Sequence, residues 1–203
     1  GPVTLSEVSW SQACLLANTQ RLQLVLEDSG QAGIYSQEQA GGWTLHSSAR
    51  LSSGPVQLPQ PSEPVGLSSR AVAEHFRQMS EMGLHYGPAF QDLEEIWTGE
   101  DECFGRLRAG VSPITALDAC FQLLLGLMHD QGPTVPVALS RLTSLGPLRG
   151  QLFCQVRRHD ASILIWDHQK QPLLHLSGMR FQRLRDEKPG LPTQMLWHLQ
   201  WRR

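Results

Sequence analysis

Two short stretches carry residues whose types and spacing could do chemistry. Residues 83–91 read GLHYGPAFQ, in which Gly-Pro predicts a turn with an aromatic residue on each side. In the second stretch, Asp118 and Gln122 lie four positions apart, on the same side of a predicted helix and at the border of its apolar stripe. Apolar surroundings disfavour the charged form of a carboxyl group and raise its pKa. Asp118 could therefore hold a proton near neutral pH and serve as a general acid.

Two helices are expected to position these residues. The longer is predicted over residues 113–130, because its apolar positions recur at helical spacing: Leu117, Phe121, Leu124 and Met128. The shorter is expected to begin with a cap at Ser68 or Ser69, to continue to Met82 and to end at Gly83.

Strands are predicted on both sides of a proline-rich stretch. They are indicated by β-branched, aromatic and alternating apolar residues at 5–10, 22–26, 32–36, 43–51, 92–98, 103–109, 152–158, 162–167 and 173–184. A sheet wrapped on one helix is an α+β arrangement, and its repetition suggests two related halves. The first half shows no long helix of its own, so we expect its apolar face to be covered by another chain or by a helix upstream.

Composition excludes several classes of function. The 17 basic and 19 acidic residues are spread along the chain, so no basic stripe for nucleic acid is expected. The apolar runs are too short to span a membrane, so no membrane is expected among its partners. The four cysteines form no CxxC pair and the eight histidines no HExxH spacing, so no metal site is expected. With no signal peptide visible, four scattered thiols indicate a cytoplasmic protein.

The two stretches resemble motifs of one enzyme family. Residues 83–91 are similar to the GYxYGPxF motif of polyketide synthase dehydratase domains, and residues 118–122 are similar to their DxxxQ motif. The order and the interval also resemble the family's. Residues 5–10, 43–47 and 176–181 resemble strands of these domains, and residues 196–201 resemble the linker into the next synthase domain.

The resemblance implies a double hotdog, with antiparallel sheets wrapped on long helices and the first hotdog incomplete. Residues 1–51 would be partial N-terminal hotdog strands, 52–67 a proline-rich linker, 68–185 the C-terminal hotdog, and 186–203 a linker toward the next domain. No cofactor is expected in the domain itself, because the substrate would be carried on the phosphopantetheine of an acyl carrier protein. Neighbouring ketosynthase and ketoreductase domains, and a second copy in a homodimer, are the other expected partners.

The resemblance also implies a reaction, the elimination of water from a β-hydroxyacyl thioester. Asp118 would be the acid that protonates the departing hydroxyl, Gln122 its orienting partner, and Tyr86 a hydroxyl near the substrate. The expected substrate-binding residues are Gly87, Pro88, Phe90 and His85. Taken alone, Asp118 fits a helix-surface carboxylate, Tyr86 fits packing of the turn, and His85 fits a loop-bonding imidazole better than a substitute base.

Three departures from the family pattern keep alternatives open. The HxxxGxxxxP motif that bears the family's base is absent from the 203 residues and is expected upstream. Gly83-Leu84 replaces Gly-Tyr, and residues 135–139 read VPVAL where the family often has LPFxW. A second hypothesis is therefore a non-dehydrating scaffold or branching domain that positions the tethered chain for a ketosynthase. An isomerase or cyclase ranks last, because those relatives tend to keep the histidine and alter the aspartate.

Overall fold

The computed structural model describes residues 1–14, 19–38, 41–128 and 134–183. These residues form an antiparallel sheet of eleven strands in the order β2-β3-β4-β1-β8-β11-β10-β9-β7-β6-β5. The strands are β1 (Val3–Trp10), β2 (Thr19–Leu26), β3 (Gln31–Glu38), β4 (Trp43–Ser53), β5 (Ser68–Arg70), β6 (Leu93–Thr98), β7 (Glu102–Leu107), β8 (Thr134–Ser144), β9 (Leu152–Arg157), β10 (Ser162–Asp167) and β11 (Pro172–Arg183). Within the described residues, two α-helices accompany the sheet, α1 (Val72–Glu81) and α2 (Pro113–Leu127). The α+β class expected from the sequence is confirmed.

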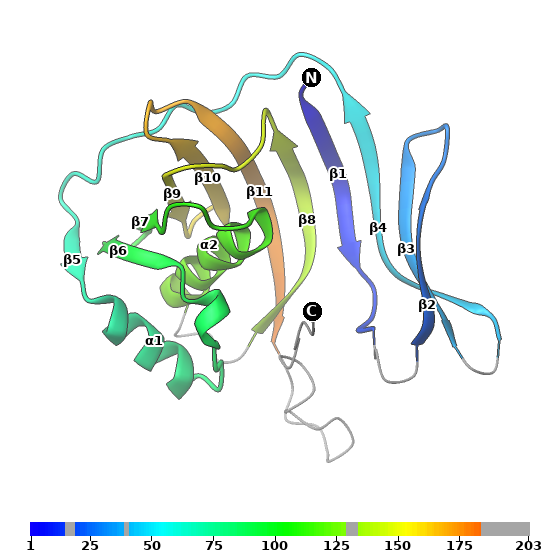
Figure 1. Cartoon of the computed structure of the whole chain (residues 1–203), viewed down its shortest axis with the longest axis horizontal. Coiled ribbons are helices and arrows are strands. Elements are labelled where there is room, and N and C mark those ends of the chain that lie inside the picture. The colour runs from blue at the N-terminus through cyan, green and yellow to red at the C-terminus, as the bar shows by residue number, and fades with distance from the viewer. Residues whose placement is uncertain (15–18, 39–40, 129–133, 184–203) are drawn as a thin grey trace.

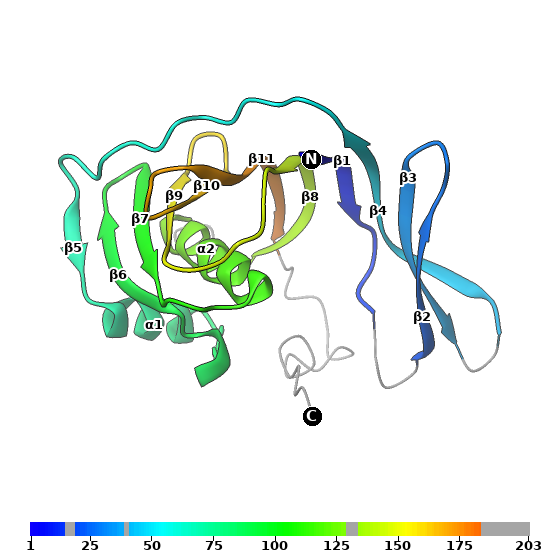
Figure 2. The same cartoon turned by 45° about the horizontal axis from the view of Figure 1, so that its top comes forward.

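The part of the sheet from β8 to β5 curls around α2 (Figure 1, Figure 2). Strand β10 shows how the two faces differ, since successive side chains alternate across a strand. Ile163 and Ile165 are fully buried in the core cluster beneath α2, whereas Leu164 and Trp166 belong to a second cluster on the outer face. The sheet therefore has apolar residues on both faces in this region, as a strand covered on both sides requires.

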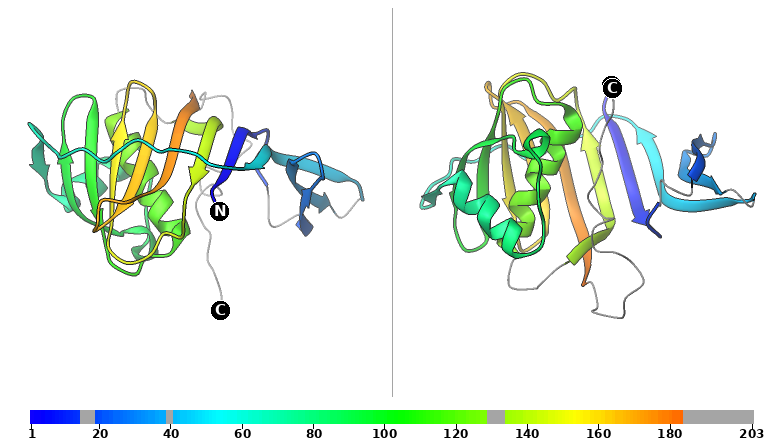
Figure 3. Two further views of the ribbon diagram at one scale, coloured as in Figure 1. Left: turned by 90° about the horizontal axis from the view of Figure 1, so that it is seen from above. Right: turned by 60° about the horizontal axis from the view of Figure 1, so that its bottom comes forward.

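The outer face is crossed by residues 54–67, here called the strap, which connect β4 to β5 without forming a helix or strand (Figure 3, left). Leu67 of the strap packs against the outer cluster, and Leu58 is buried. Near its middle, Glu63 forms an ion pair with Lys170 in the β10–β11 turn. The strap has four prolines, which remove backbone donors and disfavour pairing with the sheet.

Helix α2 is buried on more than one side, and this corrects the interpretation of its apolar stripe. The residues that are buried most completely include the small side chains Ala116, Ala119 and Cys120, together with Leu123. Three of the four predicted stripe residues, Leu117, Phe121 and Met128, are only partly buried. Ser112 caps the start of the helix, because its Oγ accepts a hydrogen bond from the Thr115 backbone N–H at 3.2 Å. Pro113 is the first helical residue, a position where the missing N–H of proline costs nothing.

Two predictions of local structure were wrong. Ser68 and Ser69 do not cap a helix but lie in β5, opposite Thr98 and Trp97 of β6, and α1 begins after Ala71 without a side-chain cap. Strand β8 was not predicted at all. Pro136 lies within it, and the pairing of β8 with β11 shifts register between Arg180 and Phe181, which pairs with Pro136. A bulge at this position tolerates a residue that cannot donate to the ladder.

The first four strands carry an apolar face that the described residues leave uncovered. Leu26 pairs with Ala32, and Ala32 pairs with Ala49, so the three side chains share one face. Ala49 packs against the core cluster beneath α2, which identifies this face as the one on the α2 side. Leu22 and Leu24 alternate with Leu26 on the same face, and all three are more than half exposed, at 52%, 71% and 56%.

Within the described residues, no helix combines the length and the apolar character needed to cross a membrane.

Candidate active site

Asp118 and Gln122 are joined by a hydrogen bond on α2. The Gln122 side-chain amide nitrogen, Nε2, donates to Asp118 Oδ2 at 2.6 Å and to the backbone oxygen of Phe90 at 2.9 Å. Gln122 is completely buried, and Asp118 is partly buried. The amide therefore fixes the carboxyl group to the turn that precedes β6. Both hydrogens of the Gln122 amide are used in this arrangement.

The environment of Asp118 favours its neutral form. Burial raises the pKa of its carboxyl group above the ordinary value, and the hydrogen bond from Gln122 opposes this shift. Burial is the larger cause, because a carboxylate loses hydration that a single amide donor does not replace. A carboxyl group in this setting can donate a proton to a reacting atom and take it back afterwards.

The turn between α1 and β6 brings Tyr86 close to this carboxyl group. Gly83 ends α1 with a φ of +83°, a conformation that glycine adopts without strain. Pro88–Phe90 then forms the short 3-10 helix η2, and Gln91 Nε2 donates to the backbone oxygen of Tyr86 at 2.8 Å. The Tyr86 ring is edge-on to Phe76 of α1, with centroids 6.4 Å apart. Burial, and then the negative charge of Asp118, raises the pKa of the Tyr86 hydroxyl, which stays protonated at neutral pH.

The remaining predicted residues of this turn differ in their exposure. Gly87 and Pro88 are exposed, and Phe90 is half-buried. His85 is also exposed, and its Nδ1 lies 3.0 Å from the hydroxyl oxygen of Ser80 on α1. The structure thus brings together Asp118, Gln122, Tyr86 and the backbone of Phe90, whereas the side chain of His85 contacts Ser80 on α1.

One buried polar residue beside the site had not been singled out. His75 of α1 is 1% exposed, and its pKa is lowered to about 4 by burial and by the charge of Arg70. The sequence signal was its position three residues after Val72 and four before Met79, on the apolar face of α1. A histidine at such a position is usually a core residue, so the pattern alone did not point to the site.

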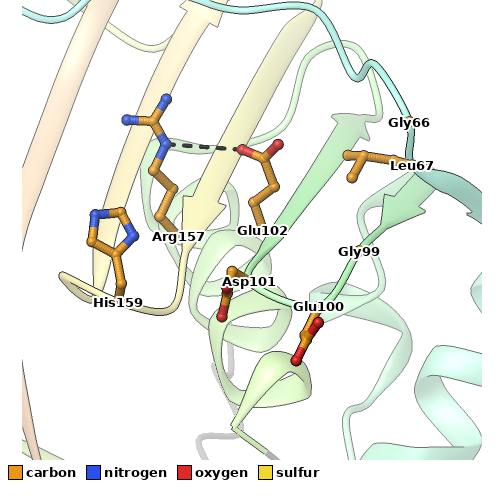
Figure 4. A pocket seen from close by; sticks show the side chains of 8 residues that line it. All are labelled: Gly66, Leu67, Gly99, Glu100, Asp101, Glu102, Arg157 and His159. Atoms are coloured by element: carbon orange, nitrogen blue, oxygen red, sulfur yellow. Dashed lines mark ion pairs between the residues drawn. The ribbon is translucent and has the colours of Figure 1, made fainter.

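A separate hollow of about 340 Å³ opens at the other end of β6 and β7 (Figure 4). Its lining residues are Gly66, Leu67, Gly99, Glu100, Asp101, Glu102, Arg157 and His159. Arg157 and Glu102 form an ion pair at 3.9 Å. None of the predicted site residues lines this hollow. Among the described residues, no group of His, Cys, Asp and Glu side chains has the arrangement of a metal site.

Residues 54–190 match the family model described as polyketide synthase dehydratase N-terminal domain. The chain belongs to the polyketide synthase dehydratase family. This match contains the turn at residues 83–91 as well as Asp118 and Gln122. It leaves the first four strands outside.

Polyketide synthases and solved dehydratase domains are similar to this chain. The spectinabilin polyketide synthase system protein NorA of Streptomyces orinoci is 40% identical over 63 residues, which are 30% of this chain and 3% of NorA. The dehydratase domain of RzxB from Pseudomonas fluorescens is 24% identical with a TM-score of 0.76, over 90% of this chain and 76% of that domain. A CurK dehydratase, an inactive aspartate-to-asparagine mutant, is 19% identical with a TM-score of 0.73, over 90% and 76%. These structural likenesses show the dehydratase fold, and the chain spans only a few per cent of the curated synthases.

Replacement of Gln122 by leucine is expected to raise the pKa of Asp118 further. The carboxylate would lose its amide donor, while burial would continue to disfavour its charge. A carboxyl group can be titrated by ¹³C NMR in the wild-type and Gln122→Leu chains. The exposed Gln171→Leu change is a suitable control. A midpoint that stays in place or moves to lower pH in Gln122→Leu would contradict the assigned hydrogen bond.

Proposed function

We propose that this chain is the part of a dehydratase domain that holds the catalytic acid, and that it acts on β-hydroxyacyl groups tethered to an acyl carrier protein. The observation that carries the proposal is Asp118, a partly buried carboxyl group with a raised pKa that is oriented by a buried glutamine. The chain's membership of the dehydratase family supports this assignment. The inactivity of the aspartate-to-asparagine mutant of the CurK dehydratase supports it as well.

In the proposed reaction, Asp118 protonates the β-hydroxyl group as it leaves. A base removes the proton from the carbon next to the thioester carbonyl, the electrons of that C–H bond form the double bond, and the β-carbon–oxygen bond breaks. Water and an α,β-unsaturated thioester are the products. We assign the base to the histidine of the family's HxxxGxxxxP motif, which does not occur in these 203 residues. Tyr86, kept protonated, would donate to the substrate beside Asp118.

The uncovered apolar face of β1 to β4 supports a double hotdog in the complete domain. Leu22, Leu24 and Leu26 present on the α2 side the kind of surface that α2 itself covers in the other half. A second helix on this face would complete a first hotdog formed with residues 1–51, beside a C-terminal hotdog of residues 68–185. We propose that the acyl chain lies between the two helices, where Asp118 would meet it. The proposed linker at 186–203 lies outside the described residues.

The proposed partners follow from this mode of substrate delivery. The thioester would arrive on the phosphopantetheine of an acyl carrier protein, and a ketoreductase domain would supply its β-hydroxyl group. The domain itself would bind no further cofactor. A ketosynthase would receive the product in the next round of extension, and such assemblies act in the cytoplasm. Association of two copies stays a prediction.

The proposal is tested by intact-mass measurement of a β-hydroxyacyl carrier protein. The enzyme should contain these residues together with the family's histidine motif. We expect the carrier protein to lose the mass of one water, whereas a carrier loaded with the saturated acyl group should keep its mass. Unchanged mass for substrates of several lengths and both hydroxyl configurations would refute the dehydratase assignment.

A further inference from the structure

Two buried polar atoms beside the site have no hydrogen-bond partner within the described part of the chain. One is Gln122 Oε1, the oxygen of the amide that orients Asp118. The other is Nε2 of His75, on α1. Buried polar groups in folded proteins are nearly always hydrogen-bonded, to protein or to ordered water. Two such atoms, on two helices that pack against each other, therefore point to a shared partner.

Their elements place the two residues close together. Gln122 and Gly126 are four residues apart on α2, so they lie on the same face and about 6 Å apart along the helix axis. The His75 ring packs on Gly126, where a Cβ would lie 3.2 Å from Cε1 and 3.4 Å from Nδ1. Glycine inside a helix is destabilising by about 1 kcal/mol relative to alanine. Here it lets the imidazole of α1 approach α2 one turn from Gln122.

The hydrogen-bonding capacities of the two atoms are complementary. Reversing the Gln122 amide would turn Oε1 toward the backbone oxygen of Phe90, which can only accept, so Nε2 must face Phe90. Oε1 must therefore accept from another donor. A neutral imidazole offers one N–H, and burial together with Arg70 lowers the pKa of His75 to about 4, so that it is neutral at physiological pH.

We propose that His75 is a positioning residue for the catalytic acid: its Nε2–H donates to one bound water, which donates in turn to Gln122 Oε1. This bridge fixes the amide, so that its nitrogen faces Asp118 and Phe90. His75 touches neither the substrate nor the reacting atoms. The inference rests on the proposed function only for its catalytic meaning, because the bridge itself can be tested without turnover.

The test is a ¹³C NMR titration of the Asp118 carboxyl group in the 203-residue chain. In His75→Phe the ring remains but the N–H is lost, so the Gln122 amide can rotate and its donation to Asp118 weakens. The carboxylate loses stabilisation, and we expect its titration midpoint to move to higher pH. In His75→Gln the amide nitrogen takes the position of Nε2, and the wild-type midpoint should return. The other titratable or charged groups that act on this pair, Arg70 on β5 and Tyr86 in the turn, are unchanged in both variants.

A second measurement needs no substitution and keeps the proposal testable if His75→Phe fails to fold. A crystal structure that resolves waters should show one within hydrogen-bonding distance of both His75 Nε2 and Gln122 Oε1. Equal Asp118 midpoints in the three proteins, or a crystal structure without this water, would overturn the bridge. Either result would leave the dehydratase proposal standing, and absence of water elimination would leave the bridge standing, so the two failures are distinguishable.

Discussion

Replacing Asp118 by asparagine should reduce the rate of water elimination by about 10²–10⁴-fold, the range over which a positioned general acid accelerates proton transfer. The amide has nearly the shape of the carboxyl group but cannot give up a proton to the departing hydroxyl. Binding of the acyl group should change little, so the loss belongs in kcat rather than in KM. Single-turnover assays with β-hydroxyacyl carrier protein, followed by intact mass, measure the effect.

Asp101→Asn is the matched control for this substitution. Asp101 is an exposed carboxylate in the turn between β6 and β7, away from the predicted site residues, and its loss should leave the rate unchanged. The same comparison separates the two functions considered from the sequence. A module whose product output is unaffected by Asp118→Asn would carry a scaffold or branching domain instead of a dehydratase.

Replacing Leu123 by alanine should lower the free energy of unfolding by about 2–5 kcal/mol, as expected for a fully buried leucine whose space is not refilled. Leu123 is 1% exposed and lies directly over Gly105 of β7, where a Cβ would come within 2.7 Å of its Cδ1. The glycine and the leucine therefore fit each other, and truncation leaves a cavity between α2 and the sheet. Denaturant titration of the chain gives the difference.

Ile114→Ala on the same helix is the control for this cavity. Ile114 is 64% exposed, so its truncation removes little buried surface, and alanine is the better helix former. We expect a change within about 0.5 kcal/mol, as is usual for surface substitutions. A similar loss in both variants would mean that α2 does not pack on the sheet through Leu123.

The regular elements were predictable where a local pattern carries the information. The strand at residues 162–167 alternates between two buried faces and is bounded by turn residues, and α2 has both a capping serine and a proline in its first turn. Strand β8 escaped prediction because Pro136 disfavours a strand locally, and only pairing with β1 and β11 compensates for it. Ser68 and Ser69 gave a false cap for a related reason, since their partners in β6 are distant in sequence.

The site was predictable to the extent that it lies on one element. The spacing of Asp118 and Gln122 places them one turn apart on a helix, and the hydrogen bond between them is present. The carbonyl group of Phe90 could not be foreseen as the second acceptor, because a backbone acceptor has no side-chain signature. The contact of His75 with Gly126 depends on how α1 docks on α2, which no local pattern in either helix specifies.

The pairing of β1 with β8 has a consequence for how the molecule holds together. The first four strands are attached to the remainder twice, by the strap and by backbone hydrogen bonds between β1 and β8. A protease that nicked the strap would therefore yield two polypeptides that stay associated. The same two pieces, produced as separate fragments, should complement each other, since peptide-bond continuity is not what keeps the sheet in register.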